Sequence, residues 1–96
     1  MEHETLHLLK TIADETRLKI LRALYEKDLY VELLAERLNL SPATVSFHMK
    51  KLMQAGLVNA RREQYYTIYS IKRDVFRHTL EDLICSDGGD TAEMLR

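Results

Sequence analysis

Residues 41–51 carry the clearest binding chemistry in this chain, because small and hydroxyl side chains there precede two lysines. Small side chains let a helix backbone approach the edges of DNA bases, and lysines reach the phosphates. The segment fits a helix pushed end-first into a major groove, and a solvated surface helix is the alternative. The candidate DNA-contacting residues here are Ser41, Ala43, Thr44, Ser46, Phe47, His48, Lys50 and Lys51.

The positive charge of the chain is concentrated around this segment. The whole chain has a net charge of −1, but residues 41–77 hold 7 basic and 2 acidic groups. Residues 1–40 hold 6 and 8, and residues 78–96 hold 1 and 5. A basic stretch inside an otherwise acidic chain is typical of a compact DNA-binding domain.

Local signals bound the candidate helix on both sides. Ser41 is a good N-cap, Pro42 suits the first helical position, and Gly56 supplies the left-handed residue that ends a helix. Asn39 can end a preceding helix over residues 31–38 in the same way, which leaves a three-residue connection. Two helices so joined form a helix-turn-helix, and a generic helical hairpin is the alternative. The buried face of the second helix should consist of Val45, Met49 and Leu52.

Apolar periodicity predicts three more helices. They cover about residues 4–13, 15–25 and 73–85, and Asp14 is a natural N-cap for the middle one. That middle helix has apolar residues around much of its circumference, so we expect it to be central and buried. These residues are Leu18, Ile20, Leu21, Leu24 and Tyr25.

Strand-like alternation follows the candidate DNA-contacting helix. It covers residues 58–61 and 65–71, with a turn over residues 62–64 that lacks the Asn-Gly or Asp-Gly signal. A hairpin packed beside that helix is a wing, and its tip would bring Arg61, Arg62 and Gln64 to phosphates or a minor groove. The predicted fold is mainly α (α+β): a winged helix-turn-helix of about five helices with a two-stranded β-hairpin.

The first and last helices carry more apolar surface than a single small domain can cover. Pairing with the same helices of a second copy is the simple solution, which predicts a homodimer. The expected interface residues are Leu6, Leu9, Val75, Phe76, Thr79, Leu80 and Leu83. Residues 1–85 would form the DNA-binding and dimerisation domain, and residues 86–96 an acidic tail or the start of a truncated linker.

Metal binding has weak support in the sequence. Asp74, His78, Glu81 and Asp82 share a helix face and, donated across a dimer, could bind a zinc-like ion. They offer one nitrogen ligand, so a solvated charged face is the stronger interpretation. Two histidines near the N-terminus lack a nearby third ligand. We therefore predict no cofactor.

The lone cysteine, Cys85, excludes an internal disulfide and a cysteine-cluster metal site. It is either a spare thiol or a redox switch that pairs with its symmetry mate. No apolar run reaches membrane-spanning length, and the start M-E-H-E is not a signal peptide, so a cytoplasmic location is expected. Neither a glycine-rich phosphate loop nor a nucleophile beside an evident base is present, which argues against an enzyme.

The chain resembles the ArsR-type winged helix-turn-helix regulators from residue 8 to about residue 76. The resemblance rests on L-L-K-T-I-A-D-E-T-R-L-K-I-L-R-A-L at 8–24, L-A-E-R-L-N-L-S-P-A-T-V-S-F-H-M-K-K-L-M-Q-A-G-L-V at 34–58, and Y-S-I at 69–71. It implies a homodimer formed by the first and last helices, and a repressor that leaves its operator when an effector binds. Carried over by position, base-facing roles fall on Thr44, Ser46, Phe47 and His48, phosphate roles on Lys50 and Lys51, and wing roles on Arg61 and Arg62.

The sequence departs from the family pattern at several positions. Phe47 replaces a polar residue, and contact with a thymine methyl would shift the preferred DNA sequence. Positions of a Cys-x-Cys metal site hold Tyr30 and Glu32. The zinc-site positions of the last helix hold Arg73 and Val75, with Ser86 and Gly89 at the later ones. The effector is therefore not expected to be a metal bound at the family's usual sites.

Two functions follow from these observations. The favoured one is a sequence-specific transcriptional regulator, acting as a repressor on an inverted-repeat operator. The alternative is a winged-helix protein-interaction module that has lost DNA binding, with Phe47 as an exposed anchor.

Overall fold

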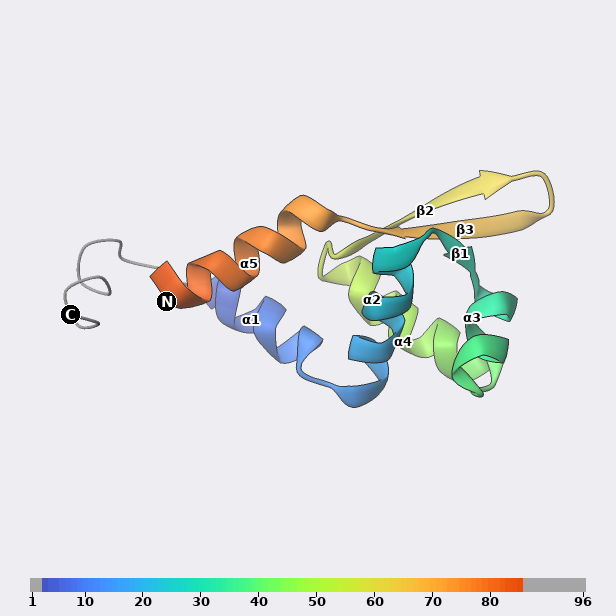
Figure 1. Cartoon of the computed structure of the whole chain (residues 1–96), viewed down its shortest axis with the longest axis horizontal. Coiled ribbons are helices and arrows are strands. Elements are labelled where there is room, and N and C mark those ends of the chain that lie inside the picture. Colours follow the sequence, from blue (N-terminus) through green and yellow to red (C-terminus); the bar gives the residue numbers. More distant parts are fainter. Residues whose placement is uncertain (1–2, 86–96) are drawn as a thin grey trace.

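The computed structural model describes residues 3–85 (Figure 1). Its elements, in chain order, are α1 (His3–Ile12), α2 (Glu15–Glu26), β1 (Leu29–Tyr30), α3 (Val31–Leu38), α4 (Pro42–Gln54), β2 (Val58–Glu63), β3 (Tyr66–Ile71) and α5 (Arg73–Cys85). All five predicted helices are present, and their bounds agree with the sequence signals to within a residue or two. The predicted tail over residues 86–96 lies outside the described residues.

The core lies where α2, α3 and α4 meet the root of the sheet. Its largest fully buried side chains are Ile20, Leu21, Leu24, Leu29, Leu34, Val45, Met49, Leu52 and Leu57. The expected buried faces of α2 and α4 are thus confirmed in most positions. Two α2 residues are corrected, since Leu18 is 41% exposed and Tyr25 is 47% exposed.

Predicted caps set the helix ends. The Asp14 carboxylate accepts a hydrogen bond from the backbone N–H of Arg17 at 2.9 Å, and the Ser41 hydroxyl accepts one from the N–H of Thr44 at 3.1 Å. Asn39 adopts a left-handed conformation with φ 56° and ψ 48°, and Gly56 has φ 77°. These caps fix the short turn between α3 and α4, and so the direction in which α4 leaves the core.

The sheet has three strands, where the sequence predicted two. Its order is β1-β3-β2, with both pairings antiparallel, and Leu29 of β1 pairs with Tyr69 of β3. The two-residue β1 is too short to show an alternating pattern in sequence. It ties the root of the wing to the start of α3.

The wing turn was predicted over residues 62–64, and the structure corrects this. The pairs Arg62↔Thr67 and Glu63↔Tyr66 belong to the β-ladder, so the turn consists of Gln64 and Tyr65. Gln64 has φ 56°. A left-handed residue early in a two-residue turn matches the strand twist, but Gln in that role gives no sequence signal.

Helices α1 and α5 lie side by side at one end of the molecule, away from the wing (Figure 1). The Thr5 hydroxyl of α1 donates a hydrogen bond to the Asp82 carboxylate of α5. Thr79, expected at a dimer interface, is 1% exposed, and its hydroxyl donates to the carbonyl of Val75. Its side chain therefore fills space inside the protomer.

Candidate nucleic-acid interface

Helix α4 presents one face to the core and the opposite face to solvent. Phe47, at the centre of the outward face, is 58% exposed. Around it the exposed residues are Ala43, Ser46, Lys50 and Lys51. The outward face thus combines small residues near the N-terminus of α4 with lysines farther along, as the sequence predicted.

Two further contacts on α4 restrict its exposed side chains. The ammonium of Lys51 lies 5.1 Å from the centroid of the Phe47 ring, which is within range of a cation–π interaction. The Ser41 hydroxyl donates a hydrogen bond to the Thr44 hydroxyl at 2.8 Å, so these two hydroxyls already engage each other. The cation–π contact thus couples Lys51 to Phe47, and the hydroxyl contact couples Ser41 to Thr44.

The resemblance gives His48 a base-facing role, but in the structure its side chain is half-buried. Its Nδ1 lies 3.3 Å from Nη1 of Arg17 and 4.0 Å from the Asp14 carboxylate. A guanidinium only donates, so Nδ1 of His48 is the acceptor in the contact with Arg17. His48 thus links α4 to α2.

Arg17, which the sequence did not single out, connects three helices. Its Nε donates to the carbonyl of Thr11 at 2.5 Å, and Nη1 contacts His48. The hydrogen bond from the Arg17 backbone N–H lowers the pKa of Asp14, and the nearby positive charge acts in the same direction. No local pattern could reveal a contact between residues 31 positions apart.

The wing arginines point to opposite faces of the hairpin, because successive strand residues alternate. Arg61 makes ion pairs with Asp28 at 2.9 Å and with Glu63 at 3.1 Å, and its hydrogen bond to Asp28 raises its pKa. Arg62 instead lines a hollow of about 380 Å³ between the wing and the N-terminus of α4, together with Pro42 and Ser46. Only Arg62 thus shares a surface with the outward face of α4.

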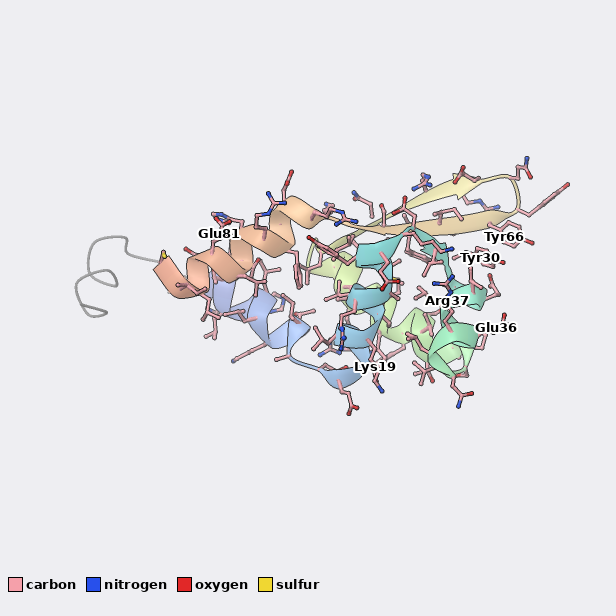
Figure 2. All side chains as sticks on the ribbon, in the orientation of Figure 1. Lys19, Tyr30, Glu36, Arg37, Tyr66 and Glu81 are labelled. Atoms are coloured by element: carbon pink, nitrogen blue, oxygen red, sulfur yellow. The ribbon has the colours of Figure 1, made fainter. Side chains whose placement is uncertain are left out.

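Tyrosines shape the wing around this hollow. Tyr30 and Tyr66 stack with ring centroids 4.6 Å apart and lie near one another in Figure 2. Tyr65, in the wing turn, is 89% exposed. Their strand-like alternation was recognised in the sequence, but their place beside α4 depends on the pairing of β1 with β3.

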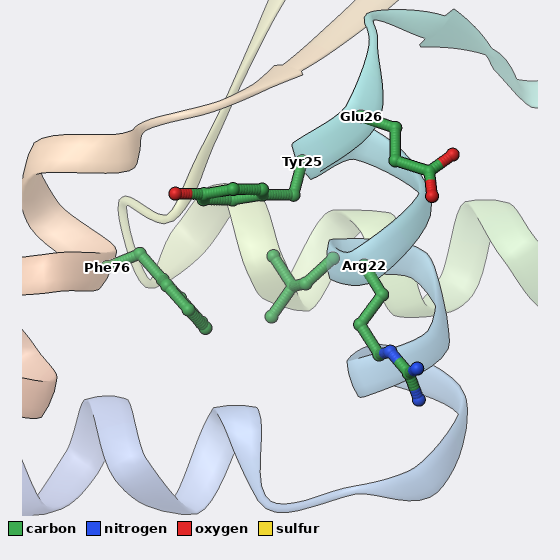
Figure 3. Close-up of a pocket in the computed structure, with 5 residues that line it drawn as sticks. Arg22, Tyr25, Glu26 and Phe76 are labelled. Carbon is green, nitrogen blue, oxygen red and sulfur yellow. The ribbon is translucent and has the colours of Figure 1, made fainter.

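A second hollow of about 260 Å³ lies between α2 and α5 (Figure 3). Phe76 projects from α5 toward α2, and Tyr25 and Arg22 line the α2 side. The guanidinium of Arg73 lies 4.1 Å from the centroid of the Tyr25 ring and also donates to the Tyr25 carbonyl. These contacts fasten the start of α5 to the end of α2.

The four weak metal candidates on α5 differ in their surroundings. Asp74, His78 and Glu81 are exposed on α5, while the Asp82 carboxylate is engaged by Thr5. Within residues 3–85, no group of three or more His, Cys, Asp or Glu side chains is placed to hold a metal ion.

Cys85 is an exposed free thiol at the end of α5. No helix in the same range is long and apolar enough to cross a membrane.

Comparison with known proteins identifies the family. The model for bacterial regulatory proteins of the arsR family matches residues 14–60. The transcriptional activator HlyU of Vibrio cholerae is 40% identical over 81 residues, which span 81% of this chain and 75% of HlyU. This chain belongs to the ArsR family. The transcriptional repressor SdpR of Bacillus subtilis is 31% identical over 77% of this chain and 82% of that protein.

Solved structures of ArsR-type regulators share the fold of this chain. HlyU from Vibrio cholerae superimposes with a TM-score of 0.74 at 36% identity, covering 88% of this chain and 99% of HlyU. The homodimeric winged helix-turn-helix DNA-binding domain of Mb0332 from Mycobacterium bovis gives 0.74 at 30% identity over 88% of this chain and 79% of that one. The predicted family and winged helix-turn-helix fold are confirmed, and the chain is a DNA-binding transcriptional regulator.

Proposed function

We propose that this ArsR-family regulator binds an inverted-repeat operator as a homodimer and represses transcription until an effector releases it. The observation that carries this proposal is α4, capped at both ends, with Val45, Met49 and Leu52 buried and Phe47 and Lys50 outward. A dimer presents two such helices, and a two-fold protein reads a palindromic site. Repression is the direction of regulation named for SdpR, whereas HlyU is named an activator.

The surface formed by α1 and α5 supports the dimer. Leu6, Leu80, Leu83 and Ile84 are exposed large apolar side chains on these two helices. An apolar patch of this kind on a small domain marks an interaction site. The homodimeric neighbour Mb0332 supports a second copy of the chain as the occupant. Of the residues predicted for this interface, Val75 and Phe76 also pack on their own core, and Thr79 is left out because it is buried.

The DNA contacts divide between α4 and the wing. We assign base-edge contacts to Ala43, Ser46 and Phe47, where the Phe47 ring meets a thymine methyl. Lys50, Lys51 and Arg62 contact phosphates. Ser41 and Thr44 act mainly by capping α4 and His48 by holding it against α2. Gln64 lies in the wing turn, where it can reach the DNA backbone, and Arg61 is not assigned a DNA contact because Asp28 and Glu63 already pair with it.

The remaining assignments follow from the same proposal. Residues 1–85 act as one DNA-binding and dimerisation domain in the cytoplasm, without catalysis. The effector is not a metal held at the family's usual positions, since Tyr30 is an aromatic residue stacked on Tyr66 and Arg73 is fastened to Tyr25.

A salt-titrated binding measurement tests this proposal. DNA fragments selected from genomic DNA by the wild-type protein are titrated with wild type, Lys50→Ala and Lys19→Ala. Lys19 is a matched control because it pairs with Glu15 on α2 at 3.5 Å. Lys50→Ala should make the negative slope of log K against log salt shallower by about one per protomer, and Lys19→Ala should leave it unchanged. An unchanged slope for Lys50→Ala contradicts the docking of α4 on DNA.

A further inference from the structure

A third hollow collects positive side chains from three helices. It has a volume of about 280 Å³ and lies between α1, the start of α2 and the second half of α4. Its lining residues are His7, Lys10, Thr11, Arg17, Lys51 and Gln54. This group contains two lysines, an arginine and a histidine but no carboxylate. Such a set attracts an oxyanion.

The base of this hollow is held in place by hydrogen bonds. Arg17, half-buried, donates from Nε to the carbonyl of Thr11 and contacts His48 through Nη1. The Asp14 carboxylate is turned to the backbone N–H of Arg17, so it caps α2 and is not among the lining residues. The guanidinium is therefore positioned before any ligand arrives, which lowers the entropic cost of binding.

The hollow is continuous with the outward face of α4. Lys51 lines it and also lies over the ring of Phe47. With Phe47 in the major groove, the DNA backbone that borders this groove therefore passes the mouth of the hollow. A phosphate of that strand has the charge and the acceptor oxygens that Lys10, Arg17 and Lys51 would bind.

We propose that this hollow binds a backbone phosphate of the operator, so that the DNA interface extends beyond α4 and the wing onto α1 and α2. The inference rests on the proposed function. Because α1 also carries Leu6 of the dimer surface, the bound phosphate lies on the inner flank of each half-site, toward the two-fold axis. The charge pattern of the sequence missed this contact, since residues 1–40 are net acidic.

The test compares Lys10→Ala with Lys19→Ala as full-length proteins. Both residues are exposed lysines on helices of the same domain, but only Lys10 lines the hollow. Lys10→Ala should make the negative slope of log K against log salt shallower by about 0.9 per protomer, and Lys10→Arg should restore the wild-type slope. Equal slopes for Lys10→Ala and Lys19→Ala overturn the inference. A wild-type protein without salt-dependent DNA binding would instead overturn the proposed function.

Neutral methylphosphonates, placed one at a time in the operator, locate the contact. Substitution on the inner flank should weaken the wild type more than Lys10→Ala, because Arg17 and Lys51 remain in the hollow of the variant. Substitution on the outer flank should weaken both equally. Inorganic phosphate at constant ionic strength provides the second arm. If it raises the Tm of the wild type but not of Lys10→Ala, while their DNA slopes agree, the site binds a free anion and the DNA assignment is wrong.

Discussion

Whether an individual residue of this protein is free to bind a ligand depends on the contacts that its neighbours already make with it. Arg61 and Arg62 are adjacent in sequence, yet Arg61 is paired with Asp28 and Glu63, while Arg62 lines the hollow beside α4. Sequence reasoning placed both at the wing tip, because a turn over residues 62–64 would have freed both side chains. The actual turn, at Gln64 and Tyr65, leaves both arginines in the β-ladder, where successive side chains alternate between faces.

This sorting gives a prediction for the two arginines. Arg62→Ala should reduce operator affinity and make the dependence of log K on log salt shallower by about one per protomer, because the proposed function assigns Arg62 to a phosphate. Arg61→Ala should change both much less, because Asp28 and Glu63 already occupy its guanidinium. Fluorescence anisotropy with a labelled operator measures both variants. A larger loss for Arg61→Ala than for Arg62→Ala would refute the assignment of faces.

The helices were predictable from local chemistry, and the links between them were not. Asn39, Ser41 and Gly56 are residues whose type and position announce a helix end, and each adopts the expected conformation. The strand β1 depends on a partner some forty residues away, and the Arg17–His48 contact on one 31 residues away. Such pairings depend on the tertiary fold, so a single sequence shows no trace of them.

Asp14 provides a test at this scale, because it caps α2, which contributes Ile20, Leu21 and Leu24 to the core. Asp14→Ala should lower the free energy of unfolding by about 1 kcal/mol at neutral pH. The folded-state pKa of Asp14 lies below its ordinary value of 3.8, so the carboxylate stabilises the fold above about pH 4. This contribution should disappear as the pH falls through the folded-state pKa.

Urea denaturation of the wild type and Asp14→Ala at several pH values measures the effect. The difference in unfolding free energy should be present at neutral pH and shrink below pH 4. Asp14→Asn is the control, since an asparagine caps a helix without a charge. A difference that grows on acidification would show that the carboxylate does not stabilise the helix start.

The wing lies at one end of the molecule and the paired helices α1 and α5 at the other, with α4 between them (Figure 1). Its overall dimensions of 51 × 23 × 22 Å reflect this separation. The apolar side chains proposed for the dimer, such as Leu83, and the outward face of α4 are therefore separate surfaces, so a substitution at Leu83 leaves α4 unchanged. The sequence predicted this division from the apolar stripes of the terminal helices, but it assigned Thr79 to the wrong side of α5.

A charge placed on the dimer surface should separate the protomers. Leu83→Glu should give a folded monomer, because Leu83 is 45% exposed and its loss leaves the core intact. Its operator affinity should fall by at least tenfold, since each monomer holds one half-site. Leu18→Glu on α2, at similar exposure, is the control and should stay dimeric. Light scattering after gel filtration distinguishes the two outcomes.

A hydroxyl-radical footprint of the wild-type protein on its selected operator tests the central claim most directly. Two copies of α4 related by two-fold symmetry should protect two patches whose centres are separated by about 10.5 base pairs or a multiple of it. The sequences under the patches should form an inverted repeat. A single protected patch, or two patches in direct repeat, would contradict a symmetric dimer that reads DNA through α4.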